Sequence, residues 1–173
     1  MIIEYSQLEA LRTLYENKKM VLFKGSFDLF HNAHLQLLKQ LSELGDILIV
    51  EVKSDIDIKN KKGLNRPIIN EKQRAEIVDS IKFVDYVIIA DNKKHTKLVD
   101  EIIELYPDDK EKLLRDGYLI EIMRPNYVCT TNEVPVPDSI AQLCNKLKIE
   151  IKVLQQIGGI HTSDIIDKIK NQF

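Results

Sequence analysis

Short apolar runs separated by amphipathic stretches constrain the fold of this chain more than any other feature of its sequence. Ile47 to Val52 is rich in β-branched residues and bounded by polar ones, so it predicts a strand that is buried on both faces. Further strands are predicted at Met20 to Phe23, Val84 to Ala90, Met123 to Cys129 and Ile149 to Leu154. Strands of this kind are typical of parallel sheets that helices cover on both sides.

Helical periodicity fills the intervals between the predicted strands. Helices are expected at 4–17, as an appendage capped by Ser6, and at Leu35 to Leu44, Asn70 to Ile81, Leu98 to Tyr106, Ser139 to Leu147 and Thr162 to Lys170. Lys53 to Arg66 is polar and contains Gly63, which favours a loop, and the charged stretch Asp108 to Asp116 is expected to be solvated and without function. The alternation predicts one domain over residues 1–173, of the α/β class, with a Rossmann-like doubly wound parallel sheet.

Composition excludes several classes of function. A chain of 173 residues with 44% apolar content can build one full core. Its net charge of -2 gives no overall attraction for nucleic acid or anionic membrane, and no stretch approaches the roughly 20 apolar residues of a membrane span. We therefore expect a cytoplasmic protein that contacts neither. Cys129 and Cys144 lie too far apart for a metal or redox motif and are expected to be buried thiols.

Chemistry is expected in the loop that follows the first predicted strand, Lys24 to His34, which leads into a helix. Backbone N–H groups and the helix dipole favour an anion such as phosphate at this point. His31 and His34 are three residues apart, so they share one face of the helix and both can donate to phosphoryl oxygens. Gly25 allows a ligand to approach the backbone closely. A structural pair of histidines, or half of a metal site, fits this spacing equally well, although no third ligand lies nearby in the sequence.

The motif Gly25-Ser26-Phe27-Asp28, followed by His31 and His34, resembles the GxFDxxHxGH signature of the cytidylyltransferase-like nucleotidyltransferases. Further agreement follows in order along the chain, at Gly45-Asp46, Ser54-Asp55, Lys62-Gly63, Arg66-Pro67, Arg74, Val84-Asp85 and the segment Gly159-Ile160-His161-Thr162-Ser163. These matches span nearly the whole chain. They are most similar to the bacterial members that activate sugar or polyol phosphates, such as ADP-heptose synthase and glycerol-3-phosphate cytidylyltransferase.

The resemblance implies an enzyme that transfers CMP or AMP from CTP or ATP to a small phosphorylated acceptor and releases pyrophosphate. It implies in-line attack by an acceptor phosphate oxygen on the α-phosphorus, with Mg²⁺ bound to the nucleotide and no metal site made by the protein alone. The catalytic residues that it implies are His31, His34, Lys62 and Arg74. The nucleotide-binding residues that it implies are Lys24, Gly25, Ser26, Phe27, Asp28, Thr162 and Ser163.

Several of these residues have a second interpretation from the sequence alone. The basic stretch that contains Lys62 can be a solvated loop, and Arg74 can be a surface residue of its helix. Thr162 and Ser163 can cap the last helix with or without a bound phosphate. His95 lies in a charged stretch without a partner motif and is expected at the surface.

Three positions depart from the family pattern: Ala33 replaces a glycine, Gln156 lies where an arginine often occurs, and His161 replaces a serine. A nucleotide-binding regulator without turnover is therefore an alternative function, and an adenylyltransferase acting on a cofactor precursor is another. A metal-binding protein is a third alternative, which lacks a third ligand. We expect a homodimer, in which the insertion between Asp91 and Met123 covers either the acceptor site or the dimer interface.

Overall fold

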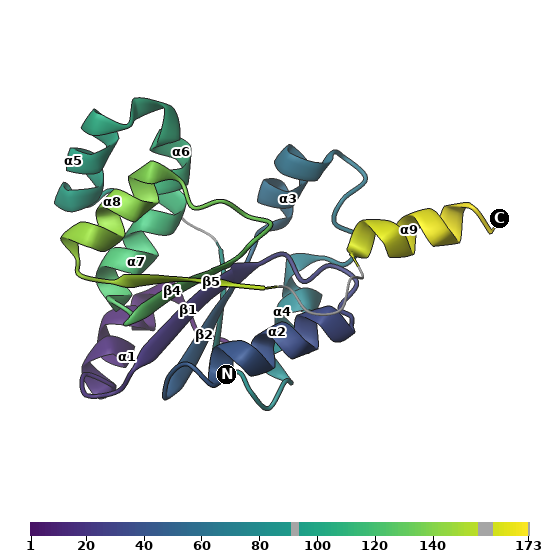
Figure 1. The fold of residues 1–173 in the computed structure, drawn as a ribbon, viewed down its shortest axis with the longest axis horizontal. Coiled ribbons are helices and arrows are strands. Elements are labelled where there is room, and N and C mark those ends of the chain that lie inside the picture. Colours follow the sequence, from purple (N-terminus) through teal and green to yellow (C-terminus); the bar gives the residue numbers. More distant parts are fainter. Residues whose placement is uncertain (91–93, 156–160, 173) are drawn as a thin grey trace.

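The structure, a computed structural model, describes residues 1–90, 94–155 and 161–172 and contains a parallel sheet of five strands (Figure 1). The strands are β1 (Met20–Gly25), β2 (Ile47–Val52), β3 (Tyr86–Ile89), β4 (Tyr127–Thr131) and β5 (Glu150–Leu154). They lie in the order β3-β2-β1-β4-β5, and every neighbouring pair is parallel. The direction of winding reverses between β1 and β4, where a doubly wound sheet forms its ligand crevice. The expected α/β Rossmann-like fold is confirmed.

Helices cover both faces of the sheet. They are α1 (Leu8–Leu14), α2 (Asn32–Ser42), α3 (Asp55–Lys62), α4 (Glu71–Asp79), α5 (Lys97–Leu105), α6 (Lys110–Lys112), α7 (Tyr118–Met123), α8 (Asp138–Lys146) and α9 (Thr162–Lys170), with shorter turns η1 (Tyr5–Gln7), η2 (Pro107–Asp109) and the π-helix η3 (Leu113–Gly117). Val21 and Phe23 of β1 pack with α2 and α4, whereas Met20 and Leu22 face the core formed with α1, α5, α7 and α8. Because both faces of β1 are covered, Met20 to Phe23 are all apolar.

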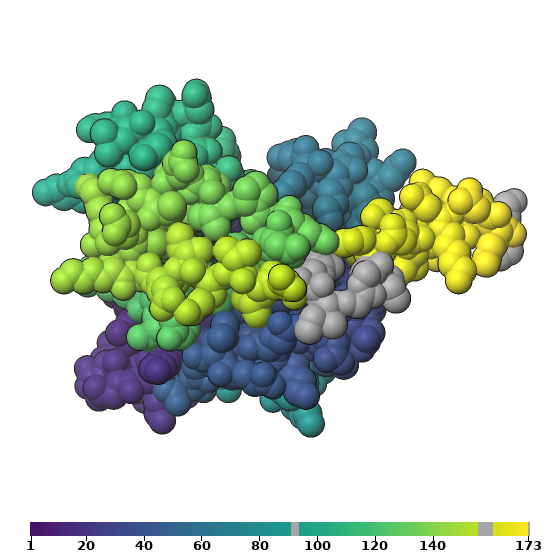
Figure 2. Space-filling model, viewed as in Figure 1, coloured from purple at the N-terminus to yellow at the C-terminus, as the bar shows by residue number. Residues whose placement is uncertain are grey.

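The last helix differs from the others because α9 has no buried side chain and extends away from the body of the protein (Figures 1 and 2). Its first residue is nevertheless anchored, since Thr162 Oγ1 donates a hydrogen bond of 2.8 Å to the backbone oxygen of Asp28. None of the helices in the described ranges is long and apolar enough to cross a membrane. The expected buried thiols Cys129 and Cys144 are confirmed.

The loop predicted between Lys53 and Arg66 is instead mostly helix α3. Ser54 caps it by accepting a hydrogen bond from the Asp57 backbone N–H, and acidic residues in the first turn and lysines in the last complement the helix dipole. Gly63 ends the helix with a φ of 93°, which glycine adopts readily. The prediction was wrong because α3 buries only Ile58, so it carries almost no apolar periodicity.

The region before β4 also differs from expectation. Met123, predicted to begin a strand, is the last residue of α7, and Arg124 then turns the chain with a φ of 40° before β4 begins. The stretch Asp108 to Asp116, expected to be solvated, buries Leu113 and Leu114 in the core. The insertion is therefore a layer of helices packed on the core, and this stretch is not a solvated loop (Figure 1).

The N-terminal appendage is shorter than predicted and better packed. Its cap is the Glu4 and Gln7 pair, whose Glu4 N–H donates 2.8 Å to Gln7 Oε1, rather than Ser6. Leu8 is fully buried, and Tyr5 Oη donates to the Glu51 carboxylate at 2.9 Å. The segment is therefore part of the core and approaches the carboxyl end of β2.

Candidate active site

The two histidines of the signature lie together at the start of α2. His31 is the N-cap residue, and its backbone N–H donates to Nδ1 of His34 at 3.3 Å. Their rings are stacked, with centroids 4.0 Å apart, and Nδ1 of His31 is buried without a hydrogen bond to any described residue. Because Nδ1 of His34 accepts a hydrogen bond, a neutral His34 carries its proton on Nε2, from which it can donate to a phosphoryl oxygen.

The surroundings keep both imidazoles neutral at physiological pH. Burial, together with the nearby His31 and Lys62 charges, lowers the pKa of His34 to about 4. Burial and the neighbouring His161 lower the pKa of His31 as well. Because burial and neighbouring positive charges disfavour these cations, the charge of a bound polyphosphate would offset the unfavourable interactions.

The turn between β1 and α2 is filled by its own aromatic side chain. Phe27 adopts a φ of 53° and is 2% exposed, and a Cβ added to Gly25 would lie 2.6 Å from Phe27 Cε2. A side chain at position 25 would collide with this phenyl ring, which accounts for the glycine, while the approach of a ligand to the Gly25 backbone stays a prediction. Phe27 also lies beside the ring of His34, at a centroid distance of 5.4 Å, and so supports it.

Asp28 is buried, and its carboxylate is bound by other residues of the protein. It is 1% exposed and accepts hydrogen bonds from the backbone N–H groups of Ile68 and Ile69 and from Arg66 Nε at 2.8 Å. Although burial alone would raise the pKa of Asp28, these donors lower it below its usual value. The carboxylate thereby ties the segment after α3 to the signature loop.

Arg74 is buried and forms hydrogen bonds to three loops. It is 0% exposed, so its interpretation as a surface residue is wrong. Its guanidinium donates to the backbone oxygens of Ile69 and Ser26, and to the backbone oxygen of Lys53 at 2.7 Å. It also pairs with Asp55 at 2.8 Å. These bonds occupy most of its five donors, so Arg74 shapes the loops around the site.

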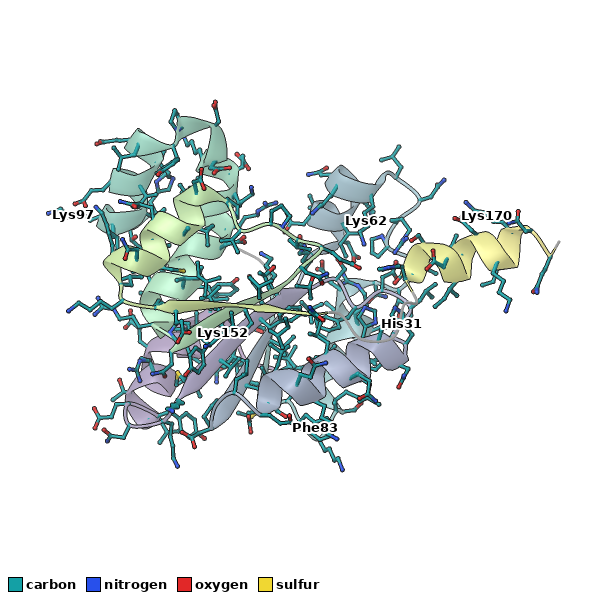
Figure 3. The ribbon with its side chains drawn as sticks, in the orientation of Figure 1. His31, Lys62, Phe83, Lys97, Lys152 and Lys170 are labelled. Carbon is teal, nitrogen blue, oxygen red and sulfur yellow. The ribbon has the colours of Figure 1, made fainter. Side chains whose placement is uncertain are left out.

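Lys62 ends α3 on the side of that helix that faces the histidines. Figure 3 shows Lys62 and His31 on the same side of the molecule, near the start of α9. Burial and the charge of Arg66 lower the pKa of Lys62. Thr162 joins the same region through its bond to Asp28, while Ser163 is exposed. The structure therefore brings together His31, His34, Lys62 and Thr162.

Lys24 is the predicted nucleotide-binding residue that points elsewhere. Its ammonium pairs with Glu51 at 3.2 Å and with Asp116 at 2.5 Å. Burial alone would lower the pKa of Lys24, but these two carboxylates raise it above the usual value. Lys24 lines a separate cavity of about 540 Å³ at the carboxyl ends of β1, β2 and β4.

Sequence reasoning missed part of this cavity. Its charged lining includes Lys53, which follows β2, and Arg115 and Asp116, which belong to the charged stretch Asp108 to Asp116 that was expected to have no function. The insertion gave no motif, and only its apolar pair Leu113 and Leu114 within a charged run could have indicated packing. Of the three departures from the family pattern, Ala33 is buried at 2% exposure and His161 lies 3.5 Å from Glu133. Gln156 lies outside the described residues.

The parallel sheet, the histidine pair at a helix start and the adjoining cationic groups define a nucleotidyltransferase of the Rossmann-like class. The chain belongs to the cytidylyltransferase-like family, whose model matches residues 22–168.

Named relatives agree with this assignment. The chain is 40% identical to the bifunctional protein HldE of Helicobacter pylori strain 26695 over 94% of its own length, and 37% identical to HldE of Campylobacter jejuni strain RM1221 over 95%. It spans about 30% of the length of these curated relatives.

Two solved structures share the fold. One is a lipopolysaccharide core biosynthesis protein from Thermoplasma volcanium, with a TM-score of 0.54 and 23% identity over 80% of this chain and 96% of that one. The other is a pantoate-beta-alanine ligase from Francisella tularensis, with a TM-score of 0.57 and 17% identity over 99% of this chain and 77% of that one.

Proposed function

We propose that this protein transfers CMP or AMP from CTP or ATP to a small phosphorylated acceptor and releases pyrophosphate. The observation that carries the proposal is the stacked pair His31 and His34 at the N-terminus of α2, beside Lys62. Sugar and polyol phosphates are the first acceptors to test, because the relatives of this chain include HldE proteins. A cofactor precursor is the second class of acceptor.

In this mechanism an acceptor phosphate oxygen attacks the α-phosphorus in line. A new P–O bond forms as the bond to the β-phosphate oxygen breaks, and pyrophosphate leaves with the bonding electrons. His34 Nε2–H donates to an α-phosphoryl oxygen, and Lys62 neutralises charge on the leaving group. Catalysis consists of positioning and charge stabilisation, so no nucleophilic side chain is required.

The magnesium ion belongs to the substrate in this proposal. Within the described residues, no three His, Cys, Asp or Glu side chains are grouped so that they could hold a metal. The Asp28 carboxylate is already occupied by Arg66 and two backbone N–H groups. Mg²⁺ therefore enters bound to the triphosphate, as it does at many nucleotide sites.

Pyrophosphate release tests the proposal. Wild type is assayed with CTP and with ATP, in the presence of Mg²⁺, against a panel of sugar, polyol and amino-alcohol phosphates. His34→Ala is the site variant, and His95→Ala is the matched control because His95 is exposed and contacts Asp100. Acceptor-dependent release that is lost only in His34→Ala supports the transferase. Nucleotide binding without turnover on any acceptor would favour the regulator.

A homodimer remains a prediction, and light scattering on the purified protein would measure its mass.

A further inference from the structure

The cavity beside the histidine site lies between α3 and the helical insertion. Its volume is about 540 Å³, and it opens at the carboxyl ends of β1, β2 and β4, where parallel sheets bind ligands. Figure 2 shows the surface indented between α3 and the helices of the insertion. A volume in this range accommodates a small metabolite.

Most charges that line the cavity are already paired. Lys24 contacts Glu51 and Asp116, and Arg115 Nη1 contacts the Asp57 carboxylate at 2.6 Å. Lys53, which follows the last residue of β2, is different. Its ammonium has no hydrogen bond or ion pair in the part of the chain that the structure describes.

A second donor, on another residue that lines this cavity, also lacks a partner. Nε of Arg115 is buried and makes no hydrogen bond to any described residue. Lys61, which lines the same wall from α3, adds another positive charge. A buried donor without an acceptor is costly, so the arrangement favours an incoming group that carries negative charge and several acceptor oxygens.

The charges around Lys53 also favour the binding of an anion. Burial lowers its pKa to about 8, and the charges of Lys61, Lys24 and Lys62 contribute while Asp116 opposes them. Glu51, Asp57, Lys112 and Arg115 are the other charged groups that line the cavity. An anion bound at Lys53 would offset this excess of positive charge.

The position of Lys53 distinguishes the two substrates. The nucleotide phosphates are assigned to the start of α2, which follows β1, and this region is tied to α9 through Thr162 and Asp28. Lys53 instead follows β2, the strand next to β1, and lines the cavity. Lys61 lines the cavity while its neighbour Lys62 acts on His34, so the two sites are contiguous across the last turn of α3.

Part of the wall contributed by the insertion and the segment after β4 is apolar. It includes Leu119, Ile120, Val134 and Pro135. A ligand held at Lys53 would therefore place a carbon skeleton with an apolar face against this wall.

We infer that Lys53, assisted by Arg115 Nε, binds the phosphate of the acceptor and determines acceptor specificity, favouring a phosphate monoester whose carbon skeleton has an apolar face. This inference rests on the proposed function. It concerns only the second substrate, so nucleotide binding does not depend on it.

Steady-state kinetics test the assignment on the best acceptor of the panel. Lys53→Met is expected to raise the KM for the acceptor about 10- to 100-fold and to leave the KM for the nucleotide unchanged, because it removes a charged hydrogen bond to one substrate only. Lys53→Arg keeps the charge and is expected to retain most of the affinity. Lys59→Met is the matched control, since Lys59 is exposed on the adjoining helix α3 and does not line the cavity. An unchanged acceptor KM in Lys53→Met would overturn the inference.

A pH profile separates binding from a structural role. In the wild type, the KM for the acceptor is expected to rise above about pH 8, as Lys53 loses its proton. In Lys53→Arg the same profile is expected to stay flat, because arginine remains charged. A rise of equal size in both proteins would assign the pH dependence to another group and contradict the inference.

Chemical labelling tests the site without any turnover. Acetic anhydride near pH 7.5 modifies neutral amines, so Lys53 is expected to react several-fold faster than Lys59 when each lysine is followed by mass spectrometry. Inorganic phosphate is expected to slow the reaction of Lys53 and not that of Lys59. Equal rates, or no protection by phosphate, would contradict the inference even if the enzyme is active. Absence of all acceptor-dependent turnover would instead contradict the proposed function.

Discussion

The ring of His31 stacks on the ring of His34 with 4.0 Å between their centroids, while the His31 N–H donates to Nδ1 of the same neighbour. These two contacts fix the orientation of His34 before any substrate binds. Burial, with the charges of His31 and Lys62, also disfavours a positive charge on His34. The pair is therefore a preorganised neutral donor whose geometry is set by the start of α2.

Removing the His34 imidazole should reduce turnover much more than binding. His34→Ala is expected to lower kcat about 10²- to 10³-fold, the usual effect of losing one donor to the transition state. The nucleotide Kd, measured by calorimetry, is expected to change only slightly, because Lys62 and the helix N-terminus remain. A loss confined to Kd, with kcat unchanged, would show that His34 binds the ground state only.

The ionisation of His34 should depend on whether a nucleotide is bound. In the free protein its pKa is expected near the low value set by burial, about 4, so its ring signals should not titrate between about pH 5 and 8. A non-hydrolysable triphosphate is expected to raise that pKa, since phosphate charge favours the imidazolium. Histidine NMR spectra of wild type and His34→Gln would assign the signal, and a midpoint near 6.5 in the free protein would contradict the prediction.

The low pKa of His34 also predicts a loss of stability in acid. The unfolded state takes up this proton near pH 6.5, but the folded state does so only near 4. Between these values the unfolded state binds more protons, so the free energy of unfolding should fall as the pH falls. Urea titrations at several pH values in this window measure the free energy of unfolding. That free energy should fall less steeply with decreasing pH in His34→Gln than in wild type. Equal slopes would indicate that His34 is readily protonated in the fold.

Arg74 should prove to be a residue that holds the loops in place. Arg74→Met leaves three backbone oxygens and Asp55 without their donor, so the free energy of unfolding is expected to fall by about 3 to 5 kcal/mol. Lys72→Met, on the exposed side of the same helix, is the control and should change stability by less than about 0.5 kcal/mol. A stable Arg74→Met protein with a raised KM for the nucleotide would support the alternative, direct contact with phosphate.

The strands could be predicted from sequence because local residues determine them. Ile47 to Val52 is apolar at every position except Glu51, and a run of this kind is typical of a strand covered on both faces. Helix α3 was missed because its stabilising features are the Ser54 cap and its charge distribution, whereas the prediction relied on apolar periodicity. A cap followed by acidic and then basic residues would have indicated it.

The roles of Arg74 and Lys24 could not be read from the sequence for a different reason. The partners of Arg74 come from residues 26, 53, 55 and 69, so its burial depends on how separate loops meet. Lys24 is oriented by Asp116, which lies 92 residues further along the chain. The motif places both residues near the site, but only tertiary contacts determine which group each of them touches.

Lys24 and Asp116 connect the insertion to the sheet, so breaking their ion pair should loosen the insertion selectively. Asp116→Ala is expected to lower the free energy of unfolding by about 1.5 to 3 kcal/mol, the contribution of a hydrogen bond to a charged group. Lys24→Met should cost more, because it also leaves the buried Glu51 without a cation. That extra cost should shrink as the pH falls towards 5, because burial raises the pKa of Glu51 and the protonated form tolerates burial. Urea titrations of both variants and the double variant, at about pH 5 and pH 8, measure these losses in the free energy of unfolding. An equal loss for Lys24→Met at the two pH values would show that Glu51 is not the group left unpaired.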